Sequence, residues 1–110
     1  WLHAKPKPVL AVPYTVELND IPMMAVQHHR SDEMYHRGVL QLDRLWRDAA
    51  KIPRMMAISV HPYITGVPHR IDAFEKLLDA VLSKPEVKVM TGEKIADWYS
   101  AQVPARVALK

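Results

Sequence analysis

The chain has 110 residues, of which 49% are apolar and 25% are charged, with a formal net charge of +3 and no cysteine. This composition is typical of a globular domain, and it excludes disulfide bonds and thiolate metal sites. Acidic and basic side chains are interspersed, so the sequence predicts no nucleic-acid partner. The longest apolar run, residues 55–58, is far shorter than the roughly 20 residues of a membrane-spanning helix, so no membrane association is expected.

Three short apolar segments alternate with three amphipathic segments along the chain. The apolar segments have the profile of strands buried on both faces, and they lie at residues 9–12, 55–60 and 87–90. The amphipathic segments repeat apolar residues with the helical period, and they lie at residues 31–51, 69–83 and 92–102. Three strand–helix units in series predict an α/β fold with parallel strands joined by helical crossovers.

Local signals predict where the helices begin and which faces they bury. Asp32 and Glu33 suit the positive end of the first helix, and Thr91 suits the N-cap of the third. The apolar face expected for the first helix comprises Tyr35, Val39, Leu42, Trp46 and Ala49. The face expected for the second comprises Ile71, Phe74, Leu78 and Val81. Gly38 lies within the first helix, where glycine costs about 1 kcal/mol relative to alanine.

Three strand–helix units do not make a complete fold, because a parallel sheet needs cover on both faces and has exposed edges. An α/β barrel needs roughly 250 residues. We therefore interpret residues 1–103 as the last three β-α units of a barrel domain, and residues 104–110 as a tail. A self-contained three-layer domain is the alternative. The first interpretation predicts exposed apolar side chains that the remainder of the barrel or another copy of the chain covers.

Candidate chemistry lies where the predicted strands end, as in other parallel α/β proteins. His61 ends the second strand, and Asn19 and Asp20 follow the first. A carboxylate beside an imidazole fixes its tautomer and stabilises the imidazolium, which suits a general acid. Alternatively, His61 is a structural residue, and the Asn19–Asp20 pair forms a turn.

The other histidines give weaker signals. His28, His29 and His36 cluster around the start of the first helix, but no two histidines are four residues apart, so no zinc-binding pair on one helical face is predicted. His69 and Arg70 open the second helix, where basic residues oppose the helix dipole. They are either surface residues or groups that face an anionic or carbonyl-bearing ligand.

Residues 13–20 (PYTVELND) and 58–71 (ISVHPYITGVPHRI) resemble two late motifs of the polysaccharide-deacetylase (NodB-homology) superfamily. Residues 89–99 (VMTGEKIADWY) resemble its closing strand and helix. The resemblance covers most of the chain. The branch that the motifs resemble contains the cofactor-independent bacterial allantoinases and related peptidoglycan deacetylases.

The resemblance implies a distorted (β/α) barrel that hydrolyses a C–N bond in an amide, acetamide or cyclic ureide. It implies that His61 is the general acid that protonates the leaving nitrogen and that Asp20 tunes His61. The residues expected to contact the substrate, a small ureide or an N-acetyl sugar, are Asn19, Tyr63, Gly66 and Arg70. A cytoplasmic homo-oligomer is expected. A non-catalytic binding or assembly module with the same fold is the alternative, and it predicts a His61 ring without a partner.

This sequence departs from the superfamily pattern in two respects. The metal-binding Asp and His-x-x-x-His pair of the superfamily belong to early motifs that nothing in this chain matches, so zinc or another divalent metal would depend on residues outside it. Carbohydrate-active members often have Trp after the motif Asp, where this chain has Ile21. That difference favours the allantoinase-like branch.

Overall fold

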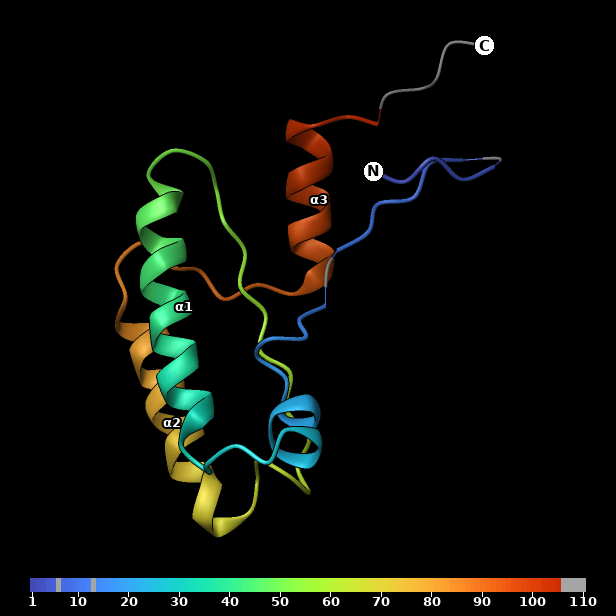
Figure 1. Cartoon of the computed structure of the whole chain (residues 1–110). Helices are drawn as coiled ribbons and strands as arrows, with labels where there is room; N and C mark the ends of the chain where they lie inside the picture. Colours follow the sequence, from blue (N-terminus) through green and yellow to red (C-terminus); the bar gives the residue numbers. More distant parts are fainter. Residues whose placement is uncertain (6, 13, 106–110) are drawn as a thin grey trace. The chain divides into compact units, whose positions relative to one another are not determined.

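The structure is a computed structural model that describes residues 1–5, 7–12 and 14–105. Its described residues form three α-helices and one π-helical turn (Figure 1). In chain order these are η1 (Ile21–Val26), α1 (Glu33–Ala49), α2 (Pro68–Ser83) and α3 (Gly92–Gln102). The three predicted helices are confirmed, with boundaries within two residues of the expected ones.

The chain divides into two units. The larger unit, Tyr14–Lys88, contains η1, α1 and α2, and the smaller unit, Trp1–Pro13 with Val89–Lys110, contains α3. Within the smaller unit the indole N–H of Trp1 donates to the carbonyl of Val103 at 2.7 Å. Thr91 caps α3 as predicted, because its Oγ1 accepts a hydrogen bond from the backbone N–H of Lys94 at 3.3 Å.

Helices α1 and α2 pack against each other, and their buried residues share the core of the larger unit with Leu18, Met23, Met24 and Ile64. Met34, Gly38 and Leu42 are buried on α1, and Leu77 is buried on α2. The buried face of α2 therefore centres on Leu77, whereas the sequence predicted Leu78, which is 38% exposed. Leu77 and Leu78 are both apolar and adjacent, so periodicity could not choose between them, and the close approach at Gly38 decides the packing.

Gly38 on α1 lies directly against the side chain of Leu77 on α2. A Cβ atom at this position would lie 2.5 Å from Cδ1 of Leu77, a side chain that is completely buried. Glycine is therefore retained inside α1 because the contact with α2 requires it, which outweighs its low helix propensity.

We expect Gly38→Ala to destabilise the larger unit. Alanine would add about 1 kcal/mol of helix propensity, but overpacking should cost about 1–3 kcal/mol because the fully buried Leu77 side chain would have to shift. Gly92→Ala is the matched control, since no atom of the described residues lies within 4 Å of a Cβ at that position. Urea unfolding of both variants measures the difference, and an equally or more stable Gly38→Ala protein would contradict the packing argument.

The three predicted parallel strands are not formed in the described part of the chain. Residues 55–60 are extended but pair at one position, through a parallel bridge between Asn19 and Ser59. Residues 9–12 were expected to be the neighbouring strand, but Val9 instead forms an antiparallel bridge with Leu2. Residues 87–90 form no strand pairing with other residues that the structure describes. A strand depends on a hydrogen-bonded neighbour, and apolar composition alone does not identify that neighbour.

Large apolar side chains are exposed in the larger unit, as the sequence predicted. Leu40 on α1 is 72% exposed and Leu82 on α2 is 69% exposed.

In the described residues, no helix has both the length and the apolar character needed to cross a lipid bilayer.

Candidate active site

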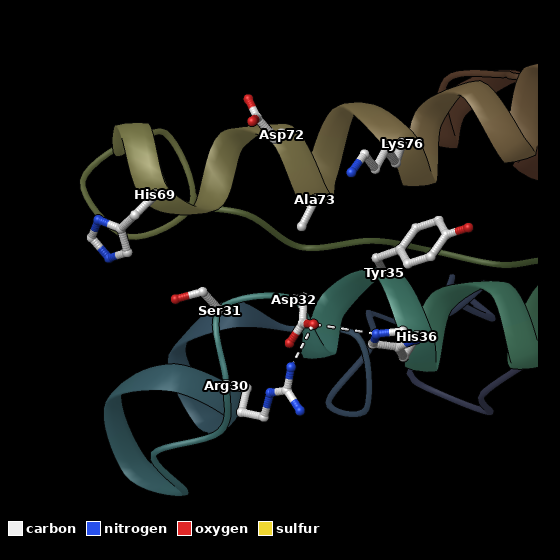
Figure 2. A pocket seen from close by; sticks show the side chains of 9 residues that line it. All are labelled: Arg30, Ser31, Asp32, Tyr35, His36, His69, Asp72, Ala73 and Lys76. Atoms are coloured by element: carbon white, nitrogen blue, oxygen red, sulfur yellow. Dashed lines mark hydrogen bonds and ion pairs between the residues drawn. The ribbon is translucent and has the colours of Figure 1, made fainter.

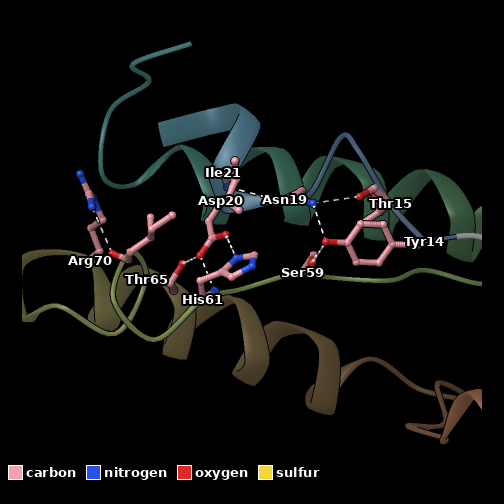
Figure 3. Close-up of polar contacts among 10 residues, drawn as sticks. Tyr14, Thr15, Asn19, Asp20, Ile21, Ser59, His61, Thr65 and Arg70 are labelled. Carbon is pink, nitrogen blue, oxygen red and sulfur yellow. Dashed lines mark hydrogen bonds and ion pairs between the residues drawn. The ribbon is translucent and has the colours of Figure 1, made fainter. Parts of the chain in front are cut away.

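Asp20 and His61 are brought together by two chain segments that run side by side. The backbone N–H of Ser59 donates to the carbonyl of Leu18 at 2.8 Å, and the backbone N–H of Asp20 donates to the carbonyl of Ser59 at 3.1 Å. The His61 ring then lies beside the Asp20 carboxylate, with Nδ1 2.7 Å from Oδ1 (Figure 3). The predicted contact between the two side chains is confirmed.

A tight turn follows His61 and adds a third side chain to this contact. The backbone N–H groups of Ile64 and Thr65 both donate to the carbonyl of His61 at 2.9 Å. This turn returns Thr65 toward Asp20, and the Thr65 hydroxyl donates to Oδ2 of the carboxylate at 2.6 Å. The same oxygen accepts the backbone N–H of His61, also at 2.6 Å. Asp20 thus accepts three hydrogen bonds although none of its surface is exposed.

The surroundings of Asp20 keep it ionised. Burial alone would raise the pKa of its carboxyl group, but the hydrogen bonds from the Thr65 hydroxyl, the His61 backbone and the His61 ring together outweigh burial. The result is a pKa below the usual value for aspartic acid. A buried carboxylate is therefore held negative beside the imidazole.

The carboxylate fixes the tautomer of His61. An ionised Asp20 can only accept, so the hydrogen on Nδ1 of the ring must lie in the contact, and Nε2 is left for other partners. The His61 side chain is 31% exposed, whereas Asp20 is fully buried. The Tyr63 ring lies beside the His61 ring, with 5.6 Å between the ring centroids, and Tyr63 is 70% exposed. One edge of the imidazole can thus meet a ligand while the other is anchored.

Asn19 is used to hold the backbone in place. Its Oδ1 accepts the N–H of Ile21 at 3.1 Å, and its Nδ2 donates to the Tyr14 hydroxyl at 3.0 Å and the Thr15 carbonyl at 3.4 Å. Ser59 donates to the same Tyr14 hydroxyl at 2.8 Å (Figure 3). These contacts match the turn role that was the alternative for Asn19, and its contact with a substrate stays a prediction.

The hydroxyl of Tyr14 should contribute to stability although most of its side chain is exposed. We expect Tyr14→Phe to lower the free energy of unfolding by about 1–2 kcal/mol, because the buried amide of Asn19 and the Ser59 hydroxyl each lose a partner. Tyr63→Phe is the control, since the described contacts of Tyr63 are made by its ring. Urea denaturation distinguishes the two variants, and equal stabilities would contradict the role of the Tyr14 hydroxyl.

Gly66 and Arg70 shape the turn that carries Thr65. A Cβ on Gly66 would lie 2.5 Å from the carbonyl oxygen of Pro62, so this position accepts only glycine without rearrangement. Arg70 donates from Nη1 to the carbonyl of Ile64 at 3.1 Å, and its buried Nε has no partner among the described residues. Both residues were expected to contact substrate. In the structure they contact the turn, and substrate contact stays a prediction.

A groove of about 590 Å³ lies between the N-terminal ends of α1 and α2 (Figure 2). Its lining mixes charges, and Asp32 in it binds both Arg30, at 3.0 Å, and His36, at 3.3 Å. His69 lines this groove, whereas Asp20 and His61 do not. We place the candidate site at Asp20 and His61 because a buried, hydrogen-bonded carboxylate and a half-exposed imidazole form a defined proton-transfer group. In the groove, Asp32 instead pairs with Arg30 and His36 near the surface.

No three His, Cys, Asp or Glu side chains of the described residues gather closely enough to hold a metal ion. The described residues therefore do not form a complete metal site by themselves, and a divalent metal would need further ligands from a longer protein.

Thr65 and Tyr14 belong to the site but carry no distinctive signal in the sequence. Thr65 lies four residues after His61, a spacing that one helical turn would bring together. Nothing in the sequence marks residues 61–65 as such a turn, so neither residue was predicted.

Comparison with known proteins gives one informative match. The chain is 37% identical over 100 residues to a Schizosaccharomyces pombe protein named "Putative polysaccharide deacetylase". The match covers 89% of this chain but 31% of the relative, so the chain spans about a third of that protein. No protein-family profile matches the chain, and no solved structure matches it. The relative is fungal, so the match does not select the bacterial branch, but it does support the polysaccharide-deacetylase superfamily that the motifs resemble.

Proposed function

We propose that this chain carries the proton-donating half of the active centre of a C–N hydrolase that removes acetyl groups from an N-acetylated polysaccharide. The observation that carries the proposal is the contact of a buried, ionised Asp20 with Nδ1 of the half-exposed His61 ring. The name of the fungal relative supports the substrate class. A non-catalytic module would not require an anchored imidazole with one free edge.

The proposed step is the departure of the amine. Water adds to the acetamide carbonyl, and the C–N bond then breaks as Nε2 of the His61 imidazolium gives its proton to the leaving nitrogen. The products are acetate and the free amine, and His61 is left neutral with its Nδ1 hydrogen still bound to Asp20. An amine leaves poorly until it is protonated, so a positioned acid accelerates this step by roughly 10²–10⁴-fold.

The described side chains supply the acid, and the nucleophilic water needs a base. The proposed enzyme is therefore a longer protein in which this chain completes a NodB-like barrel. The fungal relative extends well beyond the matched region, since that region is 31% of it. Residues 55–60, whose described strand pairing is at Ser59, would contact the rest of that domain, as would the exposed Leu40 and Leu82.

The test uses the full-length protein that contains this chain. Acetate release is measured from N-acetylated oligosaccharides of increasing length, and ring opening is measured with the ureide allantoin. We expect deacetylation, with kcat/KM rising with oligosaccharide length. Turnover of allantoin alone would replace polysaccharide by a cyclic ureide as the substrate class, and no hydrolysis of either would reject the proposal.

A further inference from the structure

We propose that Thr65 is a positioning residue whose hydroxyl holds the Asp20 carboxylate in the ionised, oriented form that the His61 ring requires. This inference rests on the proposed function only for its consequence on turnover. The contact among the three side chains stands independently of which substrate the protein uses.

The first support is that the two carboxylate oxygens of Asp20 accept from different donors. Oδ2 of Asp20 accepts the Thr65 hydroxyl and the His61 backbone N–H, both at 2.6 Å. Oδ1 accepts the ring Nδ1–H at 2.7 Å. Two donors on one oxygen fix the plane of the carboxylate, and this leaves the other oxygen directed at the imidazole. Without the hydroxyl, a single backbone donor would have to fix that orientation.

The second support is the burial of Thr65 and the rigidity of its turn. Thr65 is 6% exposed, so no water can readily replace its hydroxyl as a donor to Asp20. Its backbone N–H is bound to the carbonyl of His61, and Arg70 binds the carbonyl of the preceding Ile64. The turn thus presents the hydroxyl from a fixed position, as a group that orients another side chain requires.

Few ionisable groups of the described residues face Asp20, so an uncharged hydrogen-bond donor has a large effect on its carboxylate. In the described part of the chain, the His61 ring is the one ionisable group bound to Asp20. The preceding segment carries Tyr14 and Glu17, whose described hydrogen bonds go elsewhere, and η1 has no ionisable side chain. Burial raises the pKa of Asp20, and among the hydrogen bonds that oppose burial the one from Thr65 has the largest effect. Removing that hydroxyl should therefore raise the pKa of Asp20.

The experiment compares Thr65→Val, which removes the hydroxyl at similar size, with Thr65→Ser, which keeps it. The pKa of Asp20 is measured from the pH dependence of its carboxyl carbon signal in NMR spectra, and kcat and KM are measured on the best substrate of the full-length protein. In Thr65→Val we expect a higher pKa of Asp20 and a roughly 10-fold lower kcat, with KM changed less than about two-fold. Thr65→Ser should keep the pKa of Asp20 and kcat near their wild-type values.

Thr91→Val is the matched control. It also removes a threonine hydroxyl that makes a hydrogen bond, but that hydroxyl caps α3 and binds Lys94. This variant should lose stability without any change in the pKa of Asp20 or in kcat. If Thr65→Val does not fold, Thr65→Ala removes the same hydroxyl with less bulk and takes its place in the comparison.

Two results would overturn the inference. One is a hydroxyl-free variant that leaves the pKa of Asp20 unchanged, and the other is a Thr65→Ser protein as impaired as Thr65→Val, which would indicate a packing role. The NMR titration needs no substrate. A protein without hydrolase activity would therefore reject the proposed function, while the pKa of Asp20 would still decide the role of Thr65.

Discussion

His61→Ala should lower kcat of the full-length enzyme by roughly 10²–10⁴-fold, the range expected for loss of a general acid. KM should change little, because proton donation to the leaving nitrogen develops mainly in the transition state. The fold should tolerate the change, since the backbone N–H of residue 61 and the Thr65 hydroxyl would still bind Asp20.

His36→Ala is the matched control for this prediction. His36 is also a histidine with a carboxylate partner, but its side chain is 61% exposed and its partner Asp32 is at the surface. Steady-state kinetics of both variants on the same substrate provide the test. We expect His36→Ala to retain wild-type turnover. Near-wild-type turnover for His61→Ala would instead make His61 a structural residue and remove the proposed mechanism.

Asp20→Asn should be nearly as damaging to turnover, with a loss of roughly 10²–10⁴-fold. The reason is that Asp20 accepts three hydrogen bonds, whereas asparagine has one acceptor oxygen. If that oxygen accepts from Thr65 and the His61 backbone, the NH₂ group faces Nδ1 of the ring. The ring must then accept at Nδ1, and the imidazolium is no longer stabilised. An analogous tautomer error in the Ser-His-Asp triad costs about 10⁴-fold.

Nitrogen NMR of the His61 ring, together with kcat, checks this prediction. We expect the hydrogen of the neutral ring on Nδ1 in the wild type and on Nε2 in Asp20→Asn. Asp32→Asn is the control, because Asp32 binds His36 and Arg30 at the surface, where solvent can replace a lost contact. An Asp20→Asn protein with the wild-type tautomer and normal turnover would show that the carboxylate does not orient the ring.

The helices could be predicted from the sequence because their signals are local. Each signal comes from residues that are close together in the chain. Apolar side chains repeat every three or four residues over 35–49, Glu33 lies in the first turn of α1, and Thr91 caps α3. All three helices formed where expected. Strand pairing depends on residues far apart in the chain. The segment that pairs with Ser59 is Leu18–Asp20, which ends in two polar residues and gives little strand signal. In the apolar segment 9–12, Val9 pairs with Leu2.

The candidate site was only partly predictable for a similar reason. His61 and Asp20 were marked by motifs, and their contact is confirmed at 2.7 Å. Thr65 reaches Asp20 because residues 61–65 form a tight turn, closed by hydrogen bonds to the His61 carbonyl. Tyr14 belongs to the site because its hydroxyl accepts a hydrogen bond from the buried amide of Asn19. Neither residue has a distinctive spacing, so geometry was needed to find them.

The pairing of Asp20 with His61 joins residues 41 positions apart, and η1 and α1 lie between them. Closing a flexible loop of that length costs about 3 kcal/mol of chain entropy, which is comparable to the roughly 1.5–3 kcal/mol from a hydrogen bond to a charged group. A single hydrogen bond of the pair is therefore offset by the loop entropy, and the contact depends on the packing that holds the two segments. Leu18 and Ile64, which flank the pair, lie in the same buried cluster as Met34 of α1 and Leu77 of α2. Loss of packing between α1 and α2 should therefore weaken the Asp20–His61 contact and slow proton transfer before the helices themselves unfold.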